Sequence, residues 1–250
     1  LSYAARINDL IISVFIAAIT TVVFPMLSAA SSRNDKRQTV RILNQGVSII
    51  LLITVPATIG IFILGYPLVQ VFFQRGAFSE NASIMTSGAL IYYSVGLVAI
   101  ALRSMLNKVF YSFQDTRTPM INGAMGVLLN VVLNLLLINS MQHRGLALAT
   151  SISAIITTLT LFNSLRKKMG PLGTGNMLLS FFKTILASLV MGLFVYLIYY
   201  RLGIFLPQTR LLQFLILLMA VVVGVIVYFL MLMVLMRKEV KMLLRTVVRR

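Results

Sequence analysis

The opening stretch of the chain combines a membrane-length apolar run with side chains that could bind a charged ligand. The segment LSYAARINDLIISVFIAAITTVVFPMLS carries Arg6 and Asp9 near its start. At 100° per residue, a helix places five polar side chains along one side: Tyr3, Arg6, Asp9, Ser13 and Thr20. An arginine that lines a water-filled cavity can hold a phosphate by paired, charge-assisted hydrogen bonds. Alternatively, Arg6 and Asp9 lie in the lipid headgroup zone, and position alone leaves both interpretations open.

Two further groups of polar side chains lie inside apolar runs. Arg103 and Asn107 share one helical face; snorkelling to the nearby cytoplasmic surface explains them, and a gate or cavity role is the alternative. Asn130 and Asn134 also share a face, and Thr150 follows on the adjoining helix. Asparagines in membrane helices usually bond neighbouring helices. Because hard cations prefer oxygen ligands, a metal site for a hard cation at these three side chains is the second hypothesis.

The chain offers little for enzymatic chemistry. It has no cysteine, a single histidine at His143 and five acidic residues. No Ser/His/Asp set or clustered carboxylates are present, and the glycines of RKKMGPLGTGNM do not follow a strand as a phosphate-binding loop requires. We therefore expect a protein that is not an enzyme, with no catalytic residues and no cofactor other than the metal ion of that hypothesis.

The elements that position these side chains are predicted to be helices in a membrane. With 59% hydrophobic and 11% charged residues, the chain has too little polar surface for a water-soluble globule. A helix that crosses the hydrocarbon core needs about 20 mostly apolar residues. Such runs occur near residues 5–30, 45–72, 84–111, 121–139, 145–165, 182–200 and 211–236. Because backbone amides in lipid must be satisfied internally, we predict an all-α fold, a polytopic membrane helix bundle with seven transmembrane helices.

The positive charges alternate from loop to loop. The formal net charge is +17, and the basic residues concentrate after the first, third, fifth and seventh predicted helices. By the positive-inside rule these loops and the C-terminus are cytoplasmic. The basic tail MRKEVKMLLRTVVRR is then expected to lie on anionic membrane lipids, so nucleic acid is not an expected partner.

A Gly/Pro-rich break suggests how the chain is organised. We expect five helices in residues 1–168, a linker at 169–180, and two additional, almost wholly apolar helices with a basic cytoplasmic tail in 181–250. The chain begins with Leu1 rather than an initiator methionine, and no cleavable signal precedes the first run. These features predict that an N-terminal part precedes the chain.

Five segments occur in an order and at spacings typical of one family: YAARINDLI, TTVVFPMLS, FFQRGAFSE, VFYSFQDTRTPM and GLALATSISA. They resemble signatures of the MurJ (MviN) lipid II flippases, in the multidrug/oligosaccharidyl-lipid/polysaccharide (MOP) exporter superfamily. The resemblance implies fourteen helices, in two six-helix lobes and one additional pair. This chain would supply the C-terminal half, helices eight to fourteen, and the missing N-terminal lobe of the same protein would complete the transporter.

The resemblance also implies a function. Such a protein moves lipid II, the undecaprenyl-diphosphate-linked muropeptide, across the bacterial cytoplasmic membrane by alternating access, in peptidoglycan synthesis, cell wall biogenesis and the maintenance of cell shape. It implies that Arg6 engages the diphosphate in a cationic cavity and that the last two helices hold the polyprenyl tail. Some family members are thought to bind sodium between the helices that here carry Asn134 and Thr150.

Two alternatives to this function stay open. The chain could belong to an exporter of another polyprenyl-linked glycan or of a drug, or to a non-transporting membrane scaffold of cell-wall synthesis. A scaffold does not need a charged stripe inside the membrane, whereas a flippase for an anionic headgroup does.

Overall fold

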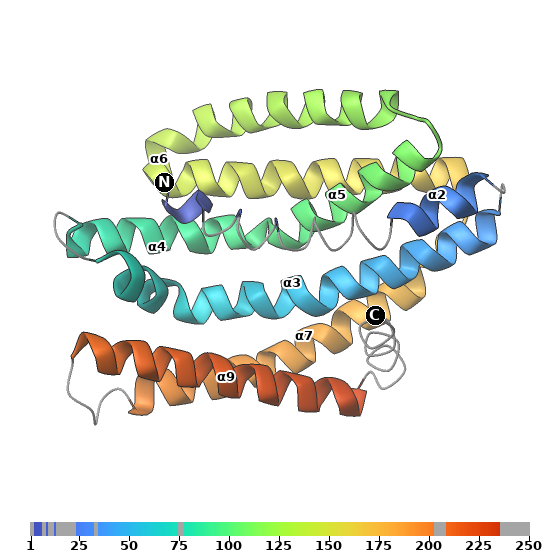
Figure 1. Cartoon of the computed structure of the whole chain (residues 1–250). Coiled ribbons are helices and arrows are strands. Elements are labelled where there is room, and N and C mark those ends of the chain that lie inside the picture. Colours follow the sequence, from blue (N-terminus) through green and yellow to red (C-terminus); the bar gives the residue numbers. More distant parts are fainter. Residues whose placement is uncertain are drawn as a thin grey trace. The chain divides into compact units, whose positions relative to one another are not determined.

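The structure is a computed structural model of the 250-residue chain, and it describes residues 3–6, 9, 13, 24–32, 35–74, 78–202 and 209–235 (Figure 1). All the regular elements in these ranges are helices, which confirms the predicted all-α class. They are α2 (Phe24–Ser32), α3 (Lys36–Phe73), α4 (Glu80–Val95), α5 (Leu97–Ser112), α6 (Arg117–Met169), α7 (Thr174–Tyr196), the π-helical segment η2 (Leu197–Leu202) and α9 (Arg210–Leu235). Most of the predicted first helix and the basic tail lie outside the described residues.

Several helices extend beyond the apolar runs that predicted them. Helix α3 begins at Lys36 and α7 at Thr174, both well before the expected positions of 45 and 182. An apolar run marks the part of a helix that lipid surrounds, and the helix continues into the headgroup region with polar residues. The predicted helix at 84–111 is divided instead into α4 and α5, which are bent by 44° at Gly96.

Helix α6 is a hairpin of two antiparallel arms. Gln142 has φ 50° and ψ −129°, which is not helical, and the chain reverses there. We call residues 117–141 the first arm and residues 143–169 the second arm; Figure 1 shows them side by side. These arms correspond to the separate helices predicted at 121–139 and 145–165.

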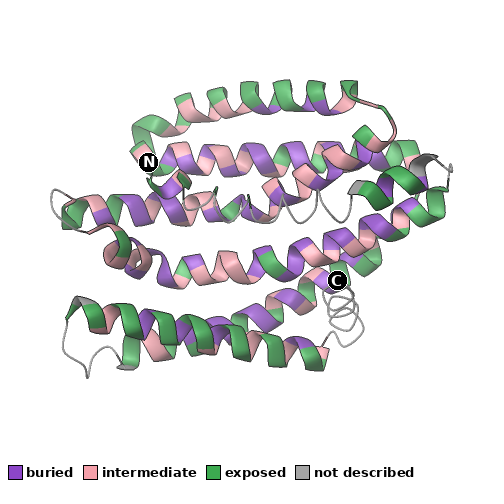
Figure 2. Ribbon diagram, in the orientation of Figure 1, coloured by how far each residue is buried: buried purple, intermediate pink, exposed green. Residues whose placement is uncertain are grey.

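The helices have the length and composition of membrane spans. Within the described residues, four helical segments can cross a membrane: α3, α6, residues 174–201 and residues 211–235. The bent pair α4–α5 makes a fifth if it is a single span. Many apolar side chains are exposed, for example along the first arm and along α9 (Figure 2), where Leu135 is 70% and Val234 is 68% exposed. Exposed apolar helices are expected where lipid is the solvent, and the described residues form a multi-pass membrane fold.

The chain divides into two compact units whose boundaries fall inside helices. The first contains residues Leu1–Ile50 and Ala89–Leu178, and the second contains Leu51–Gly88 and Leu179–Arg250. In the first unit α2 and α6 both pack on α5, with Met105, Leu106 and Phe110 of α5 almost fully buried. In the second unit the core joins α3, α7 and α9.

The segment predicted as a linker is short and anchored. The non-helical part is Gly170–Gly173, and α7 begins at Thr174. The Asn44 amide of α3 donates to the Leu172 carbonyl at 2.9 Å, and Gly173 adopts φ 71° beside it. A β-carbon at Gly173 would lie 3.2 Å from the Asn44 amide nitrogen, so a glycine suits both the backbone and the space. The division into five helices and a final pair stays a prediction.

Candidate functional site

The opening helix presents its polar stripe outward. Tyr3, Arg6, Asp9 and Ser13 are all helical, and all four are exposed, whereas Thr20 lies outside the described residues. Ala4, which lies on the opposite side of the helix, is fully buried. The packing of this helix therefore follows the predicted periodicity, with the small residue inside and the charged residues accessible.

Arg103 of α5 takes part in a row of polar contacts between α5 and the two arms of α6, which we call the polar seam. Its guanidinium donates to Thr157 Oγ1 on the second arm at 3.3 Å, and the side chain is about half-buried. Thr157 lies twelve residues before the end of α6 at Met169, so the guanidinium stays about 18 Å along the helix from that end. This position favours a role between helices over snorkelling to the surface. Asn107, one turn further along α5, is partly buried.

Asn122 extends this seam, and the sequence analysis missed it. It is only 7% exposed, and its amide donates to the Thr157 carbonyl at 3.1 Å and to Thr160 Oγ1 at 2.6 Å. Ser153 adds a hydrogen bond to the Gly126 carbonyl at 2.7 Å. The available signal was the four-residue spacing of the seam positions on the first arm: Asn122, Gly126, Asn130 and Asn134.

The three residues of the sodium hypothesis do come together. Asn130 Nδ2 donates to Thr150 Oγ1 at 3.2 Å across the hairpin, and Asn134 Nδ2 donates to Asn130 Oδ1 at 3.0 Å. Thr150 in turn donates to the Leu146 carbonyl at 3.0 Å. This chain of bonds is the interhelical contact expected of membrane asparagines. One oxygen, Asn134 Oδ1, is buried and has no hydrogen-bond partner. Among the residues described, no group of three His, Cys, Asp or Glu side chains is placed to hold a metal.

The bend between α4 and α5 is held by Ser151 of the second arm. The Ser151 hydroxyl accepts from the Gly96 N–H at 3.0 Å and donates to the Tyr92 carbonyl at 2.6 Å. A side chain inserted into the helical hydrogen-bond ladder is a known cause of such bends. Thr158 makes a similar bond to the Ala99 carbonyl at 2.8 Å. These contacts attach the segment that carries Arg103 to the hairpin.

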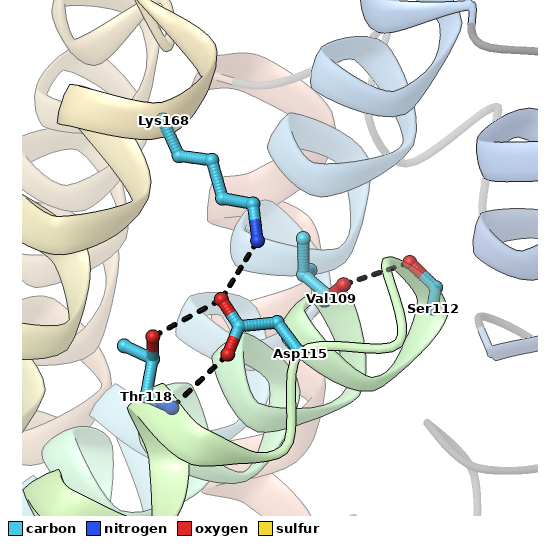
Figure 3. A network of polar contacts seen from close by, with 5 residues as sticks. All are labelled: Val109, Ser112, Asp115, Thr118 and Lys168. Atoms are coloured by element: carbon cyan, nitrogen blue, oxygen red, sulfur yellow. Dashed lines mark hydrogen bonds and ion pairs between the residues drawn. The ribbon is translucent and has the colours of Figure 1, made fainter.

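An ion pair between Asp115 and Lys168 links the turn before α6 to the last turns of the same helix. Asp115, in the turn before α6, accepts from Lys168 Nζ at 2.7 Å and from the backbone N–H of Thr118 at 3.0 Å (Figure 3). The ammonium of Lys168 also lies 5.8 Å from the ring centroid of Phe110 and 5.7 Å from that of Phe113. The network joins both ends of α6. The hydrogen bond from Lys168, followed by that from Thr118, holds the pKa of Asp115 below its ordinary value.

The lowered pKa predicts an acid-dependent loss of stability. Because the folded state binds the proton of Asp115 less tightly than the unfolded state does, the stabilisation is complete above the ordinary aspartate pKa of about 3.9. It disappears as the pH falls through the lowered folded-state pKa. Since Lys168 is 39% exposed, we expect less than about 1 kcal/mol.

The measurement is thermal unfolding of the full-length parent and of Lys168→Met between pH 7 and pH 3. The parent should be more stable near neutrality, and the difference should shrink in acid. A difference that stays constant over this pH range would contradict the assignment.

The chain is similar to a family of membrane proteins over most of its length. The family model described as "Lipid II flippase MurJ" matches residues 1–208. A curated relative from Rickettsia prowazekii (strain Madrid E), named "Probable lipid II flippase MurJ", is 34% identical over 154 residues, which are 62% of this chain and 30% of that protein. The "Lipid II flippase MurJ" of Thermosipho africanus (strain TCF52B) is 31% identical over 197 residues, which are 79% of this chain and 39% of that protein.

A solved structure has the same fold. The structure titled "Lipid II flippase MurJ, inward closed conformation" superposes with a TM-score of 0.78 at 28% sequence identity. The alignment covers 95% of this chain and 47% of that one. The chain therefore spans about a third of the length of these curated relatives and about half of the solved structure.

Proposed function

Because this chain belongs to the lipid II flippase MurJ family, we propose that the protein containing it moves lipid II across the bacterial cytoplasmic membrane by alternating access. The observation that carries the proposal is the exposed polar face of the opening helix, which presents Arg6 within an otherwise apolar segment. A permanently charged guanidinium at this position needs a partner or water. Transport breaks no covalent bond, so the protein acts as a transporter rather than an enzyme.

In this proposal Arg6 is the residue that binds the diphosphate. A guanidinium offers five donors in a planar fork, which suits two adjacent phosphate oxygens. Tyr3 and Ser13 lie on the same exposed face, where their hydroxyls can donate to the same headgroup. Asp9 lies on this face too and positions these donors. Arg103 and Asn107 serve as a gate or cavity element, for which the bond from Arg103 to the hairpin gives support. An N-terminal lobe of the same protein supplies the other wall of the cavity.

The test is a transport assay with the full-length protein in lipid vesicles. Fluorescent lipid II placed in one leaflet should become accessible in the other at a rate that depends on the protein. Transport of another polyprenyl-linked glycan, or of a drug, in place of lipid II would support an exporter of a different substrate. A folded protein that moves none of these would favour the scaffold interpretation.

The proposed topology has seven spans and a cytoplasmic C-terminus. Up to five spans are described, the reversal of α6 at Gln142 adds one crossing, and the predicted helix at 5–30 adds another. The 250 residues contain no cysteine, so any native cysteine elsewhere in the full-length protein is first replaced. Single cysteines at Ser79 or Thr209 should react with an impermeant reagent from outside the cell, and those at Lys36 or Pro171 should not. The opposite pattern would reverse the orientation.

A sodium ion at the first and second arms of α6 is the remaining part of the proposal. The buried, unpartnered Asn134 Oδ1 supports it, and Asn130 and Thr150 would contribute oxygens by releasing their hydrogen bonds. Three neutral ligands lack the charge to dehydrate an ion readily, so we expect millimolar rather than micromolar affinity, roughly −4 against −8 kcal/mol.

The check is the melting temperature of the full-length protein in sodium and in potassium, for the parent and for Asn134→Ala. The parent alone should be stabilised by sodium. Equal melting of the parent in both salts would leave these residues as interhelical hydrogen bonds.

A further inference from the structure

Two prolines interrupt the hydrogen bonding of α3 in the second compact unit. They are Pro56 and Pro67, both inside the helix. A proline has no backbone N–H, so the carbonyl four residues earlier loses its helical donor. The carbonyls affected are those of Leu52 and Ile63. In lipid no water replaces the missing donor, and a backbone oxygen left unpaired there is costly.

Both of these carbonyls accept a hydrogen bond from a tyrosine of the last helices. Tyr228 Oη of α9 donates to the Leu52 carbonyl at 2.5 Å. Tyr200 Oη of η2 donates to the Ile63 carbonyl at 3.2 Å. The two acceptors are eleven residues apart on α3, which is about three helical turns. Each hydroxyl therefore meets a carbonyl that a proline has freed.

Apolar packing brings the same three helices together at both positions. Leu52 of α3 packs with Ala187 of α7 and Leu232 of α9, and Tyr228 lies against this cluster. Further along, Leu64 packs with residues of α7 and α9, and Ile63 lies against that second cluster. A β-carbon at Gly192 of α7 would lie 2.9 Å from the Ile63 side chain of α3, so α7 and α3 approach each other closely there. The tyrosine bonds are thus part of a continuous interface.

The π-helical turn accounts for the direction of Tyr200. The helix that begins as α7 changes to π geometry over Leu197–Leu202. Each π turn contains one more hydrogen-bonded residue than an α turn, so side chains beyond its start are rotated relative to the α-helical register. Tyr200 packs there against the rings of Tyr196 and Tyr199, at centroid distances of 4.9 and 5.2 Å. Single π turns of this kind occur frequently at functional sites.

We propose that Tyr200 and Tyr228 form a hydrogen-bonded clamp that docks α7–η2 and α9 onto α3 at its two proline positions. The contact of Tyr228 with the carbonyl that Pro56 frees is called the Pro56 contact. The contact of Tyr200 with the carbonyl that Pro67 frees is called the Pro67 contact. The last two helices thereby replace the donors that α3 lacks, and α3 and the helix pair behave as one body in the second unit. This assignment goes beyond the proposed function, since it does not depend on what the protein transports.

The test is a pair of double-mutant cycles on the purified full-length protein, read by melting temperature. A Pro→Ala change restores the missing N–H, which can then bond to the freed carbonyl within the helix. We expect Tyr228→Phe and Tyr200→Phe each to lower the melting temperature by about 1–2 °C. The effect of Tyr228→Phe should shrink in a Pro56→Ala background but stay unchanged with Pro67→Ala, and Tyr200→Phe should show the reverse pattern.

Tyr196→Phe is the matched control, because it removes a hydroxyl from an exposed tyrosine of the same helix. Its effect should not change in either alanine background. Equal effects of Tyr228→Phe with and without Pro56, or equal coupling to both prolines, would overturn the clamp. The Pro56 and Pro67 contacts are tested separately. If one proline variant fails to fold, the other double-mutant cycle still tests the clamp. Because the readout is stability, failure of lipid II transport would not affect the result.

Discussion

Replacing Arg6 by alanine in the full-length protein should abolish transport of lipid II while leaving the protein folded and in the membrane. The side chain lies on the exposed face of the opening helix, and the buried contact of that segment is made by Ala4. Its loss should therefore cost little stability. A desolvated diphosphate that loses a hydrogen-bonded cation loses about 2–5 kcal/mol, which is at least about thirtyfold in binding.

Two variants make the Arg6 result specific. Arg6→Lys keeps the charge but offers no planar fork, so it should retain part of the transport rate. Arg117→Ala removes an exposed arginine at the start of α6 and should have little effect. The readouts are the vesicle assay and growth of cells in which the variant is the sole flippase. Normal growth with Arg6→Ala would show that the arginine belongs to the headgroup zone.

Replacing Gly96 by alanine should strongly reduce the amount and stability of folded protein. An added β-carbon would lie 2.7 Å from Ser151 Oγ and 2.8 Å from Ser151 Cα. Because Ser151 Cα belongs to the backbone, rotating the side chain cannot remove the clash, and the second arm must shift. That movement also breaks the bond between the Gly96 N–H and Ser151. Overpacking of this kind costs about 1–3 kcal/mol, and the lost hydrogen bond adds to it.

A second glycine of the same unit provides the control for Gly96. A β-carbon at Gly123, on the first arm, meets nothing within 4 Å. Gly123→Ala should therefore be neutral or stabilising by about 0.5–1 kcal/mol, because alanine favours a helix. Yield of monodisperse protein and melting temperature would be compared for both variants. If Gly96→Ala melts with the parent, the close approach of α4–α5 to the hairpin is wrong.

The sequence by itself predicted the class of the fold and the directions in which several side chains face. Lipid imposes a simple rule, that a span is a long apolar helix, so hydropathy located the helices that the structure describes. Helical periodicity also places Arg6 and Ala4 on opposite sides of the opening helix, and in the structure Arg6 is exposed and Ala4 is buried. The four-residue spacing of Asn130 and Asn134 predicted a shared face, and the two side chains are hydrogen-bonded. All of these depend on residues close together in the chain.

Features that depend on distant neighbours were decided only by the tertiary structure. The run at 84–111 is apolar throughout, and its division at Gly96 depends on Ser151, 55 residues away. Asn122 is an ordinary polar residue until the hairpin places Thr157 and Thr160 beside it. The carbonyls freed in α3 are visible from its prolines, but their donors lie 137 and 176 residues further along the chain. Hydropathy and periodicity predict which side of a helix is apolar. The hydrogen-bond partner of a side chain depends on how whole helices pack, because only packing brings one particular hydroxyl within reach of one particular carbonyl.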